Sequence, residues 1–167
     1  MKKLSLLKDW TKIMFILCML AVLLTPGIII LTIVFPHLVP EGVNFTWGVE
    51  INFAGIIITM IIFSGYCCFV YSLYLFRKVL SFFWKKKFFD DEVVKLLDRV
   101  GKLIYLGLFL TVVPINVYYL ATQKGFHFDF IEFWRIVFIL SLGLFFTVLS
   151  EVFQMAKNLQ EENDLTV

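Results

Sequence analysis

The sequence predicts an all-helical integral membrane protein, a bundle of four spanning helices that forms a single domain over residues 1–167. The first observation is composition: 60% of the residues are apolar and the mean hydropathy is +0.90, whereas soluble domains are roughly 45–50% apolar. The second is pattern, because four segments with uncharged middles are each long enough to cross a hydrocarbon layer of about 30 Å. The third is charge, since lysines and arginines gather in alternate polar segments.

The first span is expected at about residues 13–35, an uncharged run that follows four lysines and a single acidic residue. A cleaved signal peptide would have a shorter apolar core and a small-residue cleavage site, so we expect this segment to be retained. Pro26 predicts a bend within it, because proline removes one helical hydrogen bond. The loop that follows contains no lysine or arginine. The second span is expected at residues 52–76.

A connector at residues 77–102 carries eight of the fifteen basic residues of the chain. Lys85, Lys86 and Lys87 lie among aromatic residues beside a span, a pattern typical of contact with anionic lipid. Basic residues interleaved with aromatic ones also occur at nucleic-acid sites, but the position beside a span favours lipid. We therefore expect no direct binding of nucleic acid.

The second half of the connector predicts an amphipathic helix that runs into the third span, residues 103–120, where Pro114 predicts another bend. Asp90 is expected to cap this helix. Its apolar stripe is expected to pack against the bundle or to lie in the membrane interface, with a binding groove for another protein as the alternative. The stripe consists of Val93, Leu96, Leu97, Val100 and Ile104, and the expected ion pairs four residues apart are Asp91 with Lys95 and Asp98 with Lys102.

The fourth span is expected at residues 133–150, and Arg135 at its outer edge is expected to pair with Glu132 or Asp129. A helical tail follows at residues 151–167, with an apolar stripe and an acidic end. Thirteen of the fifteen basic residues lie in the N-terminal segment, the connector and the tail. Because such residues stay on the cytoplasmic side, both chain ends are expected in the cytoplasm. The tail stripe consists of Val152, Met155, Ala156 and Leu159.

No catalytic motif is present, and the middles of the spans contain no ionisable side chain of the kind that intramembrane chemistry needs. We therefore expect neither an enzyme nor a bound cofactor or metal. His37 and His127 in the outer loops, with nearby carboxylates, could hold a divalent metal, but scattered loop residues are the interpretation that we prefer. The cysteines, Cys18, Cys67 and Cys68, lie inside apolar segments and are expected to act as small hydrophobic residues.

Two stretches carry a family resemblance. One is Phe89-Asp90-Asp91-Glu92 with Leu96-Leu97-Asp98-Arg99-Val100-Gly101; the other is Val152-Phe153 with the closing run from Leu159 to Val167, a tail of the Glu-Glu-Asn-Asp-Leu-Thr-Val type. With the span pattern, they resemble a bacterial family of four-span membrane proteins of unknown function, often encoded beside a small Xre-type helix-turn-helix regulator. The resemblance implies this topology in the bacterial inner (cytoplasmic) membrane and a regulatory partner, without an established activity.

These observations lead us to expect an interaction or regulatory protein that presents residues 90–104 and 151–167 to a soluble cytoplasmic partner. The resemblance suggests that this partner is a helix-turn-helix transcription regulator. The alternatives are a small transporter or channel component that forms a homo-oligomer and, third, a membrane enzyme or metal binder that uses the outer His and Glu residues. The expected partner-binding residues are Asp90, Asp91, Arg99, Glu161, Glu162, Asp164 and Leu165.

Overall fold

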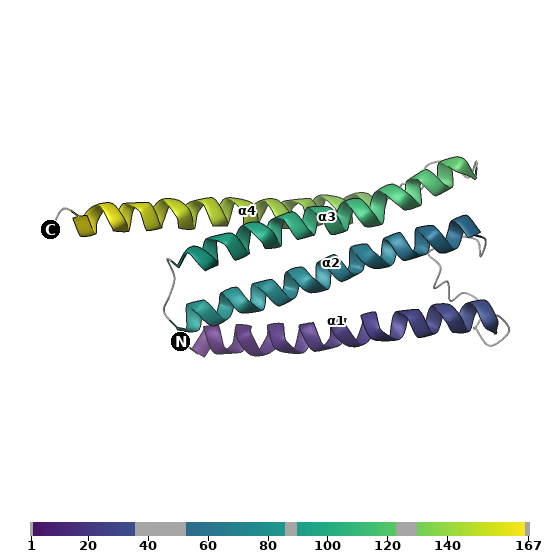
Figure 1. Ribbon diagram of the computed structural model, residues 1–167, viewed down its shortest axis with the longest axis horizontal. Helices are drawn as coiled ribbons and strands as arrows, with labels where there is room; N and C mark the ends of the chain where they lie inside the picture. The colour runs from purple at the N-terminus through teal and green to yellow at the C-terminus, as the bar shows by residue number, and fades with distance from the viewer. Residues whose placement is uncertain (1, 36–52, 86–89, 123–129, 166–167) are drawn as a thin grey trace.

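In the computed structural model, four long helices lie side by side (Figure 1). Each of them is long and apolar enough to cross a membrane, which confirms the all-helical fold and identifies a multi-pass membrane protein. The structure describes residues 2–35, 53–85, 90–122 and 130–165. The helices are α1 (Lys2–Val34), α2 (Phe53–Trp84), α3 (Asp91–Ala121) and α4 (Phe130–Leu165).

The helices are longer than the spans predicted from the uncharged runs. α2 continues past the predicted end of its span to Trp84, and α4 continues through the tail to Leu165. At a rise of 1.5 Å per residue, α4 is about 54 Å long, which exceeds a hydrocarbon layer of about 30 Å. The charged residues therefore end the apolar segment without ending the helix. α1 and α3 likewise continue through Pro26 and Pro114.

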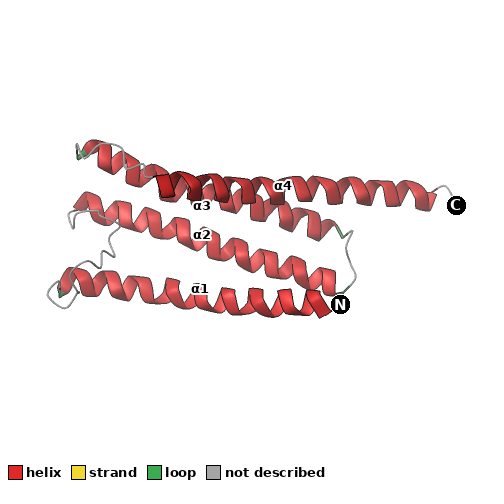
Figure 2. Cartoon of the chain, turned by 180° about the vertical axis from the view of Figure 1, so that it is seen from behind, coloured by secondary structure: helices red, strands yellow, loops and turns green. Residues whose placement is uncertain are grey.

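Both ends of the chain lie at the same end of the molecule (Figure 1). α1 begins there and α4 ends there, and α2 also ends there and α3 begins there; we refer to it as the terminal end. In both views α4 projects past the other three helices at the terminal end (Figure 2). This arrangement follows from four antiparallel helices, of which the last is the longest.

α2, α3 and α4 pack around one hydrophobic core near the terminal end. Its most deeply buried members are Val79 from α2 with Val93 and Leu97 from α3. The ring of Phe146 from α4 lies 5.2 Å from that of Phe76 in α2, measured between centroids. The other core residues are Leu75, Leu96, Val100 and Ile104.

Glycines let the helices approach closely, as is common between helices in membranes. A Cβ atom on Gly65 of α2 would lie 3.0 Å from the carbonyl oxygen of Gly107 in α3. One on Gly101 of α3 would lie 3.0 Å from the carbonyl oxygen of Gly143 in α4. α2, α3 and α4 are therefore held together by backbone-to-backbone packing as well as by side chains.

α1 is attached differently. Among the described residues, its backbone approaches α2 and no other helix, and its apolar side chains are exposed around most of its circumference. Contiguous exposed hydrocarbon of this extent marks a surface covered by membrane. α1 therefore presents most of its surface for contact with lipid.

Candidate interaction surface

The first turn of α3 is built as predicted. Asp90 has an extended backbone, and its carboxylate accepts a hydrogen bond from the backbone N–H of Glu92 at 3.0 Å, which confirms the expected cap. Asp91 and Glu92 add negative charge at the positive end of the helix dipole. Glu92 also pairs with Lys78 of α2 at 3.4 Å. The start of α3 is thereby fixed against the end of α2.

The apolar stripe of this segment faces the interior. All five of its residues, from Val93 to Ile104, are buried in the core between α2 and α4. Of the uses left open by the sequence, packing against the bundle is confirmed. The alternative of a binding groove is wrong for this stripe, because the groove would need the same side chains that complete the core.

The last turns of α4 are fastened to α2 and α3 by three kinds of contact. The hydroxyl of Ser150 donates to the carbonyl oxygen of Val94 at 2.9 Å, and the ring of Phe153 stacks on that of Phe83 at 5.5 Å. The ammonium of Lys157 donates to the Asp91 carboxylate at 2.6 Å. These contacts fix which side of α4 faces the bundle up to Lys157.

The ion pair between Lys157 and Asp91 also sets the protonation of both groups. The hydrogen bond from Lys157 lowers the pKa of the Asp91 carboxyl below its ordinary value. The hydrogen bonds to Asp91 and then to Glu161, which lies 3.2 Å away, raise the pKa of Lys157. Both groups are therefore charged throughout the neutral range. The sequence predicted that Asp91 pairs with Lys95, whereas in the structure the Asp91 carboxylate pairs with Lys157. The other expected pair, Asp98 with Lys102, is confirmed at 2.7 Å.

The opposite side of these turns carries an uncovered apolar stripe. Val152, Met155 and Leu159 are 53%, 64% and 61% exposed, whereas Ala156, which the sequence placed on the same stripe, is half-buried. The predicted periodicity is thus confirmed for three residues, and they point away from the bundle. We call Val152, Met155 and Leu159 the tail stripe from here on.

The structure brings together only some of the charged residues predicted to bind a partner. Asp90 and Asp91 are engaged in the cap and the ion pair, while Glu161 shares Lys157 with Asp91. Arg99 and Glu162 are exposed, and Arg99 lies about 12 Å along α3 from Asp91 at 1.5 Å per residue. Asp164 and Leu165 are in the last turn of α4, but their side chains are outside the described set, as are all of Lys86 and Lys87.

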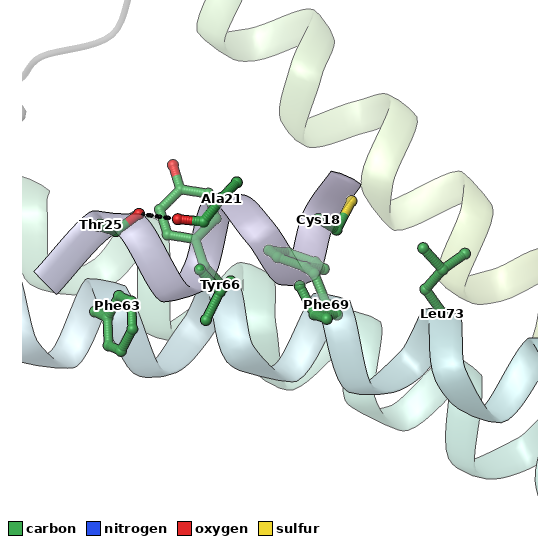
Figure 3. Close-up of a pocket in the computed structure, with 9 residues that line it drawn as sticks. Cys18, Ala21, Thr25, Phe63, Tyr66, Phe69 and Leu73 are labelled. Carbon is green, nitrogen blue, oxygen red and sulfur yellow. Dashed lines mark hydrogen bonds between the residues drawn. The ribbon is translucent and has the colours of Figure 1, made fainter. Parts of the chain in front are cut away.

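A cavity of about 330 Å³ lies between α1 and α2 (Figure 3). Its lining is mostly aliphatic and aromatic, and the hydroxyl of Thr25 is already bonded to the carbonyl oxygen of Ala21 at 2.7 Å. Such a lining suits hydrocarbon, and it holds no acid–base pair. The thiol of Cys18 is part of it, in line with the expected role of the cysteines as small hydrophobic residues. The labelled lining residues are Cys18, Ala21 and Thr25 from α1 with Phe63, Tyr66, Phe69 and Leu73 from α2.

A second, polar cavity of about 230 Å³ lies between α2, α3 and α4, far from the terminal end. We call it the polar cavity. Asn116 of α3 lines it, and the side-chain oxygen of Asn116 is buried without a hydrogen-bond partner among the described residues. Glu132 and Arg135 of α4 line it too, and their predicted ion pair is confirmed. An unpaired buried acceptor costs about 1–3 kcal/mol.

Sequence reasoning missed this cavity, because Asn116 resembles any polar residue near the end of a span. The outer His and carboxylate set, for which we preferred scattered loop residues over a metal site, stays untested because His37 and His127 lie outside the described residues. Within residues 2–35, 53–85, 90–122 and 130–165, no three His, Cys, Asp or Glu side chains are grouped as metal ligands.

Comparison with curated proteins and with solved structures gives no match. A family model described as a protein of unknown function, DUF2975, matches residues 48–167. The match covers α2, α3 and α4 and leaves out α1, the helix that packs on α2 alone. It confirms the predicted membership of a family of unknown function, whereas the regulatory partner stays a prediction. Because the match spans most of the chain, this protein belongs to the DUF2975 family.

Proposed function

We propose that this protein is a membrane-embedded interaction protein that presents the end of α4 to a soluble cytoplasmic partner. The observation that carries the proposal is the tail stripe, three apolar side chains that are more than half exposed. They lie in the last turns of α4, beyond the predicted end of the fourth span, and α4 ends by projecting past the other helices (Figure 2). In the proposed orientation water instead of hydrocarbon would surround them. Exposed apolar surface in water favours association with a partner.

The spacing of the tail stripe supports one mode of recognition. Val152, Met155 and Leu159 are at positions i, i+3 and i+7, the pattern by which an amphipathic helix lies in an apolar groove of a partner. The stacking of Phe153 and the ion pair of Lys157 hold this helix in place before binding. A pre-organised helix loses less conformational entropy on association, which favours affinity.

The charges around the tail stripe support a basic partner. Glu161 and Glu162 are exposed just beyond it, and complementary charge mainly accelerates and orients association. DNA-binding proteins carry basic surfaces, so a helix-turn-helix regulator, the partner suggested by the family resemblance, fits this end. Exposed ion pairs contribute only about 0–1 kcal/mol each, so the tail stripe has to supply most of the affinity.

The tail stripe gives a direct test of the proposal. Replacing Met155 and Leu159 together by serine is expected to reduce co-purification with a neighbouring helix-turn-helix regulator at least about tenfold, because two anchors of roughly 1–2 kcal/mol each are lost. Deleting residues 160–167 is expected to abolish capture while the helices stay inserted and folded. At the end of the tail, Leu165→Ala is expected to weaken binding more than Asp164→Asn.

The matched control is Asn158→Ser, which replaces one polar side chain by another in the same part of α4. This variant should leave capture of the partner unchanged. Normal capture by the Met155/Leu159 double variant, with its folding verified, would remove the tail stripe as the binding surface. Failure of the deletion variant to fold would instead make the tail structural.

The proposed orientation places the terminal end in the cytoplasm of a bacterium, with both termini inside. It is supported by the thirteen basic residues of the N-terminal segment, the connector and the tail. Reporter fusions after Lys12, Lys86 and Val167 are expected to report a cytoplasmic location, and a fusion after Gly48 an external one. A periplasmic signal from the fusion at Lys86 would contradict the arrangement.

In this orientation the basic run at the end of α2 would meet the inner leaflet. Lys85 is exposed there, directly after Trp84. Together with Lys86 and Lys87 it is proposed to hold anionic lipid, with about 1 kcal/mol from each basic residue near the headgroups.

A further inference from the structure

The cavity between α1 and α2, which we call the α1–α2 cavity, has the dimensions of a site for hydrocarbon (Figure 3). Its lining on α2 extends from Phe63 to Leu73, about 15 Å at 1.5 Å per residue. That length equals one leaflet, half of a hydrocarbon layer of about 30 Å. Ala21 and Tyr66 in the lining are exposed, so the cavity is open to the surrounding membrane. Its volume of about 330 Å³ holds part of one acyl chain and not a whole lipid.

A basic side chain lies just beyond the end of this cavity that is nearer to the terminal end. Arg77 follows Leu73 by four residues, so the two share one face of α2 and lie about 6 Å apart along the helix. The Arg77 guanidinium lies 4.8 Å from the ring centroid of Phe15 in α1. That ring also lies 5.9 Å from the ring of Tyr74, between centroids. Arg77 is therefore held where α1 and α2 meet, at the level where the uncharged run of α2 ends.

The charge of Arg77 has no carboxylate partner among the described residues, although the side chain is half-buried. The ring of Phe15 satisfies the charge only in part, because one aromatic face cannot accept from five N–H donors. A guanidinium with unused donors suits a phosphate, which it can bind through two parallel hydrogen bonds. The other described basic side chains either pair with a carboxylate, as Lys78, Lys102, Arg135 and Lys157 do, or are exposed, as Lys12, Lys85, Lys95 and Arg99 are.

We propose that the α1–α2 cavity and Arg77 together form a site for one anionic phospholipid. One acyl chain lies in the cavity, and the phosphate accepts hydrogen bonds from Arg77. The chain gains little by leaving other chains, because lipid tails are as apolar as the lining. Selectivity among lipids therefore comes from the headgroup at Arg77, while the cavity fixes the place of the chain. The site is distinct from the basic run that begins at Lys85, eight residues further along the chain.

The test compares phosphatidylglycerol with phosphatidylcholine of identical acyl chains, on the full-length protein in detergent. Native mass spectrometry counts the retained lipids, and we expect the first phosphatidylglycerol to be retained about fivefold more strongly. The same excess is expected after Lys85, Lys86 and Lys87 are replaced by glutamine, because these residues are not part of the site. Equal retention of the two lipids by either protein would overturn the proposal.

Cys18 reports on the α1–α2 cavity without any substitution, because it is part of the lining. Its alkylation by N-ethylmaleimide is measured by peptide mass spectrometry, with Cys67 and Cys68 outside the lining as internal references. When phosphatidylglycerol fills half of the sites, the rate at Cys18 is expected to fall about twofold, since the occupied half is protected. An unchanged rate at that occupancy would place the chain elsewhere and contradict the proposal.

Two substitutions, made in the protein without the basic run, separate the charge from the cavity. Arg77→Gln is expected to abolish the fivefold excess, whereas Lys95→Gln removes an exposed cation elsewhere and should preserve it. Cys18→Phe fills the cavity and is expected to remove the tightly retained lipid. Its control is Met19→Phe, at a position that is 41% exposed and outside the lining. A folded Arg77→Gln variant that keeps the full excess would show that another group binds the phosphate and would overturn the proposal.

Discussion

Replacing Leu97 by alanine is expected to lower the free energy of unfolding by about 2–5 kcal/mol, the range for truncating a fully buried leucine. The side chain is 0% exposed and lies in the core that joins α2, α3 and α4. Truncation leaves a cavity that these helices cannot easily close, because their glycine contacts already hold the backbones together. Chemical denaturation of the detergent-solubilised protein, followed by circular dichroism, measures the loss.

The matched control is Leu106→Ala in the same helix. Leu106 is 47% exposed and faces lipid or detergent, so its truncation should leave no cavity and change the free energy of unfolding far less. Equal losses for the two variants would mean that the core near Leu97 does not hold the helices together.

Gly101→Ala is expected to destabilise the protein by about 1–3 kcal/mol through overpacking. The added Cβ atom would lie 2.5 Å from the hydroxyl oxygen of Thr147 and 3.0 Å from the carbonyl oxygen of Gly143. Thr147 itself donates to that carbonyl at 3.1 Å, so a shift of its side chain disturbs an existing hydrogen bond. α3 and α4 therefore have to separate, which the same denaturation experiment detects.

Gly27→Ala provides a control with the opposite sign. No atom lies within 4 Å of a Cβ built on Gly27 in α1, and alanine is the better helix former by about 0.8–1 kcal/mol. A small gain or no change is expected there. A loss of stability in Gly27→Ala comparable to that in Gly101→Ala would contradict the packing argument, because neither close packing nor helix propensity predicts a loss at Gly27.

The sequence predicted those features that depend on neighbours along the chain. Uncharged runs located the four spans. Asp90 was predicted as a cap because it lies two residues before Glu92, whose backbone N–H donates to it. Asp98 was predicted to pair with Lys102, which lies one helical turn later. Helical periodicity also located the tail stripe. Periodicity alone does not say which way a stripe points, however, because that depends on where Phe153 and Lys157 find partners.

Features that depend on how the helices cross were beyond the sequence. Lys157 and Asp91 are 66 positions apart, and only the packing of α4 on α3 brings them together. The polar cavity likewise needs three helices, because Asn116 of α3 lines it together with Glu132 and Arg135 of α4. The end of α2 was missed for a different reason, because charged residues end an apolar segment but are compatible with a continuing helix.

The peripheral position of α1 makes it the part of the protein most responsive to bilayer thickness. Its apolar segment from Asp9 to Ile30 is about 33 Å long at 1.5 Å per residue, close to the match for an average membrane. Spanning helices adapt to a thinner or thicker bilayer by changing their tilt. α2, α3 and α4 have to tilt as one body, whereas α1 is held on one side only. A change in thickness is therefore expected to be absorbed between α1 and α2, at the cavity beside Cys18 and Phe69.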